Sequence, residues 1–243
     1  MLRVAQRVVG EVQSLRQIGA EFSARGVGSL TIAATHTHAR YALPKTIERF
    51  TKRYPRVQLR IRQGTPTEIA RWVCAGEADL SIATEPLEPF ADLVLLPCYQ
   101  LHRIVLTKPG HPLLRLKRLT LEPLAQYPLI TYDAAFMARS KIVRAFSERG
   151  LTPNIVLSAA DADVMKTYVR NGLGVAILAK LAYDPTEDRD LRVVDASHLF
   201  EPNTINVGMR RNNYLREYMY DFIELFAPQL TRAKVEKALR AVV

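Results

Sequence analysis

The sequence predicts an α/β protein built from two units, with the second unit inserted into the first. Residues 29–84 alternate strand-like and helix-like patterns in the order β-α-β-α-β, which is typical of a parallel sheet covered by helices. Residues 94–200 repeat that alternation. One more strand pattern and a strongly amphipathic helix pattern follow at 203–230. If these complete the first unit, the chain leaves it near residue 97 and returns to it near residue 202.

The first unit contains one helix whose start is well specified by its sequence. Thr65-Pro66-Thr67-Glu68 combines a capping box with proline at the first helical position, and Gly76 ends the helical pattern. The strand before this helix alternates between two faces, which carry Val57, Leu59 and Ile61 on one side and Gln58, Arg60 and Arg62 on the other. The other elements expected here are strands at 29–35, 57–64 and 78–84 and a helix at 39–55.

The second unit contains a helix whose two ends are indicated by the sequence. Asp161 or Asp163 lies at its N-terminus, and Gly172 follows its end. Gly172-Leu173-Gly174 resembles the start of a dinucleotide fingerprint, but the third glycine is missing and the segment follows a helix, so a helix end and strand entry is favoured. The elements expected here are strands within 94–113 and 121–133 and at 154–159 and 175–180, and helices within 121–133 and at 140–151 and 161–174.

Residues 1–24 contain no proline and form a helical pattern with apolar residues at a spacing near 3.5. One heptad position holds Met1, Val8, Leu15 and Phe22, and another holds Val4 and Ile18. Two interpretations stay open, a coiled-coil seam and an amphipathic helix packed on its own domain. Residues 23–29 break the pattern with two glycines, so we expect a hinge there.

The composition is that of a soluble globular protein with a basic charge. The 243 residues carry a formal charge of +10 and two cysteines, Cys74 and Cys98, which form no CxxC pair. This pattern excludes a structural zinc site and a secreted disulfide framework. No apolar stretch reaches the ~20 residues of a membrane span. The N-terminus has charges every few residues, unlike a signal peptide, so we expect a cytoplasmic protein with no membrane partner.

The basic surplus is concentrated between Lys45 and Arg62, where seven lysines and arginines stand against Glu48 alone. A nucleic-acid contact is one interpretation of this segment. However, the charges divide between a helix face and a strand face, and no aromatic side chain lies among the exposed positions. A solvated or subunit-contacting surface is therefore favoured.

Motifs of catalysis and metal binding are missing from the sequence. No GxSxG, HExxH or P-loop pattern occurs. His36 and His38 would share one face of a strand, but no cysteine or carboxylate lies nearby in the sequence to complete a metal site. We therefore expect neither an enzyme nor a protein with a metal or cofactor.

Threonines mark the ends of two expected strands. Thr35 and Thr37 follow the first strand at the start of a helix, and Thr84 ends the third strand. In a parallel sheet both positions lie at the carboxyl edge, where ligands bind in open α/β folds. A helix N-terminus at that edge favours an anion. The alternative is that Thr35 or Thr37 only caps the helix.

Together these segments resemble the effector-binding part of the LysR-type transcriptional regulators, and more narrowly their CysB/Cbl-like subgroup, which governs sulfur assimilation. The resemblance covers nearly all of residues 1–230. It is carried by Gly28-Ser29-Leu30, Leu43-Pro44, Tyr54-Pro55, Gly64-Thr65, Gly76-x-x-Asp79-Leu80 and Val169-x-x-Gly172-x-Gly174-Val175, and by the segments THTHARYALP, ADLSIATE, LPCY and DADVMKTYVRNGLGV.

The resemblance implies two Rossmann-like subdomains joined by two crossover strands, as in periplasmic binding proteins, preceded by a linker helix. The implied parts are a linker and dimerisation helix at 1–24, subdomain I at 28–97 and 202–243, and subdomain II at 98–201. It also implies a homodimer or homotetramer that binds promoter DNA through a helix-turn-helix absent from this chain. The strand Val57–Arg62 and the first helix would form an isologous subunit contact.

The resemblance further implies a small anionic effector in the cleft between the subdomains, either sulfate, an acetylserine or a related sulfur metabolite. The anion-binding threonines of the subgroup fall on Thr35, Thr37 and Thr84, and a neighbouring glutamine falls on His38. Leu101 stands where a tryptophan lines the cleft, and Ala160 stands where another threonine is expected. The anion pocket is thus mostly retained, while the departures concern the organic end of the effector.

We therefore expect the effector-sensing domain of a regulator of sulfur assimilation and cysteine biosynthesis genes. The alternative is a free solute- or anion-binding protein of the same two-lobed fold. The missing signal peptide and the N-terminal heptads argue against that alternative.

Overall fold

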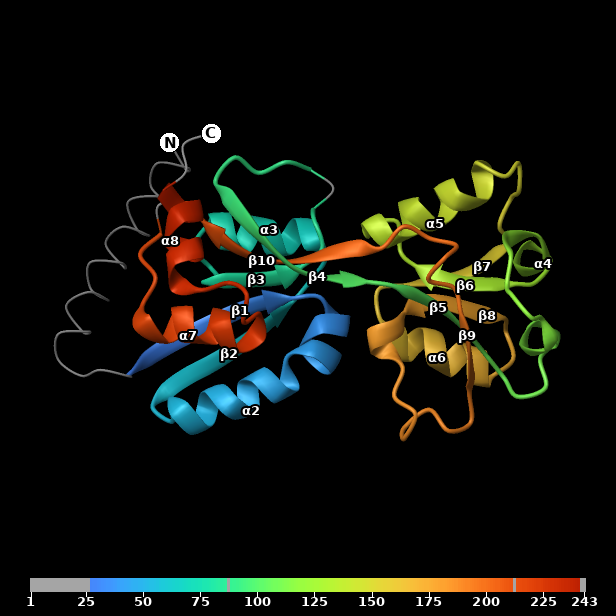
Figure 1. Cartoon of the computed structure of the whole chain (residues 1–243), viewed down its shortest axis with the longest axis horizontal. Helices are drawn as coiled ribbons and strands as arrows, with labels where there is room; N and C mark the ends of the chain where they lie inside the picture. Colours follow the sequence, from blue (N-terminus) through green and yellow to red (C-terminus); the bar gives the residue numbers. More distant parts are fainter. Residues whose placement is uncertain (1–26, 87, 212, 241–243) are drawn as a thin grey trace. The chain divides into compact units, whose positions relative to one another are not determined.

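The computed structural model describes residues 27–86, 88–211 and 213–240, which fold into two α/β units (Figure 1). Of the described residues, unit 1 takes those up to Cys98 and those from Ile205 on, and unit 2 takes Tyr99–Thr204. The limits expected from the sequence, residues 97 and 202, fall within three residues of these boundaries. The expected linker helix at 1–24 lies outside the described residues. Within the described part, no helix has the length and apolar character needed to cross a membrane.

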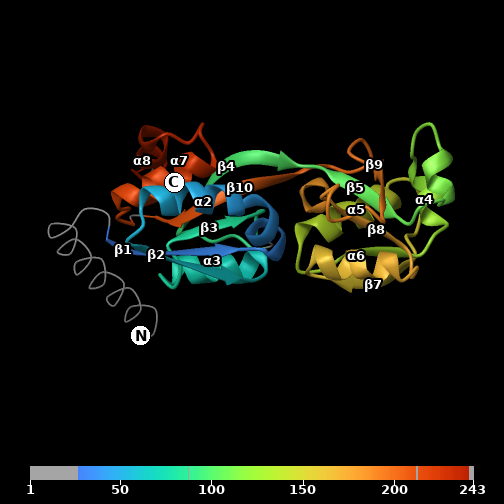
Figure 2. The ribbon, with the colours of Figure 1, turned by 90° about the horizontal axis from the view of Figure 1, so that it is seen from below.

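Unit 1 is built on a mixed five-stranded sheet with helices on both sides. Its strands are β1 (Gly28–Ala34), β2 (Val57–Gln63), β3 (Leu80–Ala83), β4 (Leu93–Leu101) and β10 (Asn203–Arg210), and its helices are α2 (Pro44–Arg53), α3 (Pro66–Cys74), α7 (Glu217–Phe226) and α8 (Arg232–Arg240). β4 and β10 continue across the unit boundary, so the end of β4 from Tyr99 and the start of β10 up to Thr204 belong to unit 2. The strand order is β2-β1-β3-β10-β4. β1 runs parallel to β2 and β3, as predicted, while β10 runs antiparallel to β3. Figure 2 shows α2, α7 and α8 on one side of the sheet and α3 on the other.

Unit 2 is built on a second mixed five-stranded sheet, in the order β7-β6-β8-β5-β9. Its strands are β5 (Arg103–Thr107), β6 (Leu129–Tyr132), β7 (Ile155–Ala159), β8 (Val175–Ala179) and β9 (Arg192–Asp195), and its helices are α4 (Leu121–Ala125), α5 (Met137–Ser147), α6 (Ala162–Arg170) and the short 3-10 turns η2 (Pro112–Arg115) and η3 (Lys180–Ala182). β6 runs parallel to β7 and β8, while β5 runs antiparallel to β8 and β9. Figure 1 shows α5 and α6 on opposite sides of this sheet. The α/β class expected from the sequence is confirmed.

Each unit has its own apolar core. In unit 1 the ring of Phe50 on α2 lies 5.4 Å from that of Phe222 on α7, and both side chains are fully buried. In unit 2 Ile142 and Phe146 of α5 pack into a cluster with Ile177 of β8. Helices that bury such faces against a sheet stabilise both elements through apolar burial.

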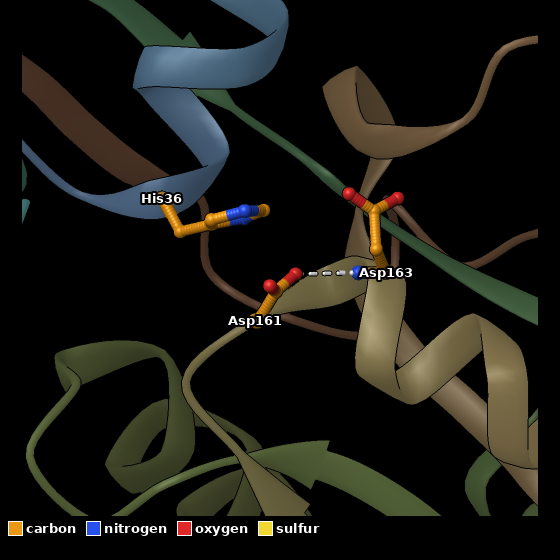
Figure 3. A group of neighbouring side chains, drawn as sticks. All are labelled: His36, Asp161 and Asp163. Atoms are coloured by element: carbon orange, nitrogen blue, oxygen red, sulfur yellow. Dashed lines mark hydrogen bonds between the residues drawn. The ribbon is translucent and has the colours of Figure 1, made fainter.

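The helix ends that the sequence specified are confirmed. Thr65 Oγ1 accepts the N–H of Glu68 at 3.4 Å, and the Glu68 carboxylate accepts the N–H of Thr65 at 2.8 Å, which completes the capping box of α3. Asp161, rather than Asp163, caps α6, since its Oδ1 accepts the N–H of Asp163 at 2.7 Å (Figure 3). Gly172 follows α6 with a φ of 79°, as a helix-terminating glycine does.

The helix expected at 39–55 is wrong as a single element. A π-turn, η1 (His38–Ala42), comes first, with the N–H of Leu43 donating to the carbonyl of His38 at 3.0 Å. The α-helix α2 then begins at Pro44, where it is in the first helical position. Because proline has no N–H and its ring clashes with the preceding turn, it starts a new helix here instead of continuing the old one.

The two faces expected along β2 are present, because the strand pairs with β1 in unbroken register, but burial decreases toward its end. Ile61 is 42% exposed, whereas the guanidinium of Arg62 lies 3.8 Å from the ring centre of Trp72 on α3 and pairs with Glu77 at 2.5 Å. β2 is the edge strand of the sheet. An edge strand has a neighbouring strand on one side only, so its side chains are less fully covered than those of an interior strand.

Candidate functional site

The threonines singled out in the sequence lie at the ends of two neighbouring parallel strands in unit 1. Ala34 at the end of β1 pairs with Ile82 of β3, so Thr35 and Thr84 follow their strands at the same edge of the sheet. Thr35 is buried, with 4% exposure, and Thr84 is half-buried. The carboxyl edge of parallel strands is where open α/β sheets bind ligands.

Thr35 is joined to His38 by a short buried contact. Oγ1 of Thr35 and Nδ1 of His38 are 2.6 Å apart, and His38 is 2% exposed. The direction of this hydrogen bond depends on the imidazole tautomer. If Nδ1 carries the proton and donates, the Thr35 hydroxyl keeps its own proton to donate elsewhere.

Thr37 occupies the position before η1, but its side chain makes no capping hydrogen bond. Its backbone is already helical, with φ −55° and ψ −42°, while a capping residue normally has extended backbone. The alternative that Thr37 serves as a cap is therefore wrong. Thr37 is 5% exposed, so this hydroxyl is a buried polar group at the strand edge.

The other two candidate residues belong to unit 2. Leu101 is the last residue of β4 and is buried. Ala160 is exposed and lies between β7 and the cap of α6. His36, which the sequence offered as a metal ligand with His38, belongs to unit 1, while Asp161 and Asp163 belong to unit 2 (Figure 3).

The basic segment is partly neutralised within unit 1. Lys52 pairs with Glu48 at 2.7 Å, and Arg53 pairs with Asp221 at 2.8 Å. Since these charges lie on α2 and β2 and are mostly exposed, the segment has the character of a solvated surface.

The two cysteines are poor candidates for redox chemistry. Burial raises the pKa of both the Cys74 and the Cys98 thiol to about 11. A redox-active cysteine needs a populated thiolate, which a raised pKa disfavours near neutral pH. These residues therefore serve as small apolar side chains.

The sequence did not predict the unusual environment of Arg103. Arg103 opens β5 and is 2% exposed, although it begins an apolar strand with the sequence RIVLT. The only signal available in the sequence is a charged residue at the start of a strand that is otherwise buried.

A family model of the LysR substrate-binding domain matches residues 23–231. The chain belongs to the LysR family of transcriptional regulators. The regulator CysB of Burkholderia cenocepacia is 50% identical over 240 residues, which cover 99% of this chain and 77% of that protein. The regulator SsuR of the same organism is 46% identical, and the regulator Cbl of Escherichia coli is 42% identical over 93% of this chain and 71% of that protein.

A solved structure agrees with these LysR relatives. The crystal structure of the cofactor-binding domain of the Cbl transcriptional regulator is 42% identical, with a TM-score of 0.84 over 88% of this chain and 95% of that one. The fold and the family expected from the sequence are thus confirmed. These relatives are transcriptional regulators rather than enzymes, which favours a sensor domain over a free solute-binding protein.

Proposed function

We propose that this LysR-family chain senses a small anionic sulfur metabolite for a regulator of sulfur assimilation genes. Its similarity to CysB, SsuR and Cbl supports the sulfur assignment. The observation that carries the anion assignment is the register of β1 against β3, which brings Thr35 and Thr84 to one edge of the sheet.

In the proposed site, four residues of unit 1 hold the anion: Thr35, Thr37, His38 and Thr84. Thr37 and Thr84 donate their hydroxyl protons to the anion, and so does Thr35 when His38 donates to its oxygen. His38 thereby fixes the Thr35 hydroxyl in a donating orientation. Leu101 and Ala160 in unit 2 set which organic group the protein accepts.

The regulator would act in the cytoplasm as a homodimer or homotetramer, and would reach promoter DNA through a helix-turn-helix outside this chain. The edge strand β2 supports a subunit contact, because it exposes Ile61 and its outer edge pairs with no other strand of the described residues.

Replacing Thr37 with valine tests the anion site, because valine keeps the shape and removes the donor. We expect sulfate to bind this variant ~1–2 kcal/mol more weakly, the contribution of a hydrogen bond to a charged group. Isothermal titration calorimetry at constant ionic strength measures the change. Thr51→Val is the matched control, because Thr51 is exposed on α2 and bonds only to the helix backbone. Equal sulfate affinity in the parent and Thr37→Val would remove Thr37 from the site.

A further inference from the structure

Arg103 in unit 2 is a buried guanidinium without a carboxylate partner. It is 2% exposed, and its one hydrogen bond within the described chain goes from Nη2 to Oδ1 of Asn203. Its Nη1 has no partner there, and no Asp or Glu of the described residues forms an ion pair with it. A buried charge is costly unless it is paired and hydrogen-bonded.

The surroundings of Arg103 supply further hydrogen-bond donors. Nδ2 of Asn203 is buried and has no partner among the described residues. The guanidinium lies 5.7 Å from the ring centre of Tyr132, whose hydroxyl accepts the N–H of Ala179 at 3.0 Å and so keeps its own proton to donate. Burial lowers the pKa of Arg103, as expected for a cation enclosed without a counter-ion.

These groups lie at one edge of the unit 2 sheet. Arg103 begins β5 opposite Ala179, the last residue of β8, and Tyr132 is the last residue of the parallel strand β6. This is the carboxyl edge of β6 and β8, the position at which open α/β sheets bind ligands. This edge is therefore rich in hydrogen-bond donors, while the side-chain oxygen of Asn203 already accepts a hydrogen bond from Arg103.

We propose that unit 2 holds an anion site of its own, in which Arg103, Asn203 and Tyr132 bind the carboxylate of a small organic acid. A carboxylate offers two acceptor oxygens in one plane, which matches the planar guanidinium fork and the neighbouring amide. This inference stands on residues of unit 2 alone and does not depend on the threonine site of unit 1.

The test uses thermal unfolding of the whole chain with acetate as the probe and acetamide, which has no charge, as the control at constant ionic strength. A ligand that binds the folded state raises the melting temperature. We expect acetate to raise it in the parent protein and acetamide to leave it unchanged. An equal response to the two probes, or no response to acetate, would overturn the proposal.

Two variants assign the response to this site. Arg103→Met should weaken the apparent acetate affinity at least about tenfold, because it removes the charged donor. Asn203→Asp places a carboxylate beside Arg103, so it should raise the melting temperature without probe and abolish the acetate response. Arg149→Met, which removes an exposed arginine of unit 2, should behave like the parent. An acetate response that persists in both Arg103→Met and Asn203→Asp would overturn the assignment.

Thr37→Val separates this proposal from the threonine site. If the acetate response belongs to unit 2, it persists in Thr37→Val whether or not sulfate binding is weakened there. If Thr37→Val lost the acetate response while Arg103→Met kept it, carboxylate binding would belong to unit 1. That outcome would contradict the inference.

Discussion

At the scale of the single residue, Asp79 shows burial competing with hydrogen bonding. Its carboxylate accepts the N–H of Thr31 at 2.7 Å, and both this bond and the charge of Arg216 lower its pKa. Burial has the larger effect, so the pKa of Asp79 is raised above its ordinary value. The ionised carboxylate is therefore less favourable in the folded state than in the unfolded chain.

The sign of this shift predicts a pH dependence. A carboxyl group with a raised folded-state pKa stabilises the fold below its unfolded pKa of ~3.9, and that contribution is lost as pH rises through the folded-state pKa. Asp79→Asn keeps an oxygen to accept the Thr31 N–H and cannot ionise. We expect this variant to be more stable than the parent at pH 7, with the difference shrinking as pH falls toward 4. Urea unfolding at several pH values measures this, with the exposed Asp92→Asn as control. A constant difference across this pH range would contradict the expectation.

The sequence predicted residues whose roles depend on near neighbours in the chain. The reciprocal bonds of Thr65 and Glu68 follow from spacing, because the partners are three residues apart. Spacing also placed the cap of α6 at Asp161 or Asp163, and the structure selects Asp161. Arg103 and Asn203 could not be predicted, since they are 100 positions apart and the burial of an arginine depends on strands brought together by the whole unit.

At the scale of the element, α6 is fixed to the segment before β9 by a buried ion-pair network. Nζ of Lys166 lies 2.7 Å from Oδ2 of Asp188, and both residues are 1% exposed. Arg170 on the next turn of α6 bonds to Oδ1 of Asp188 at 2.9 Å and to the exposed Asp190 at 2.8 Å. This network holds one helix face to a loop that has little apolar surface.

Two neighbouring aspartates allow a matched test of this network. Asp188→Asn leaves the buried Lys166 without its closest carboxylate, so we expect a loss of about 3 kcal/mol in the free energy of unfolding. Asp190→Asn breaks an exposed pair with the same arginine and should cost less than about 1 kcal/mol. Chemical denaturation of both variants gives the comparison. Similar losses of unfolding free energy in Asp188→Asn and Asp190→Asn would show that burial does not decide the strength of these ion pairs.

Elements with strong local signals were predicted, and those shaped by context were not. The strand β9 was missed because Arg192–Asp195 is short and has charged residues at both ends. The π-turn η1 could not be distinguished from a longer helix, because the apolar residues from Ala39 to Pro55 keep a helical spacing. Only the position of Pro44 within that spacing signalled the break.

At the scale of the whole molecule, the edge strand β2 predicts how chains associate. Ile61 is 42% exposed on this strand, and an exposed apolar residue at an open sheet edge is a site for pairing with another chain. We expect Ile61→Lys to weaken self-association by at least about tenfold, because a lysine would be desolvated in such a contact. Sedimentation velocity over a concentration series measures it.

Leu116→Lys is the matched control, because Leu116 is equally exposed, at 41%, but belongs to unit 2 and not to β2. It should leave the association unchanged. A parent chain that is monomeric at micromolar concentration would contradict the subunit contact, and so would equal effects of the two lysine variants.

The strand order of unit 1 has a consequence for synthesis on the ribosome. β10 lies between β3 and β4 in the sheet, yet nearly all of unit 2 precedes it in the chain. While residues 99–204 are being made, β3 keeps an open edge and β4 has no strand to pair with. The side chain of Phe50 is also uncovered, because α7 has not yet been synthesised. The contiguous unit 2 can mature in that interval, whereas the nascent unit 1 exposes surfaces that chaperones recognise and that other unfinished chains can join.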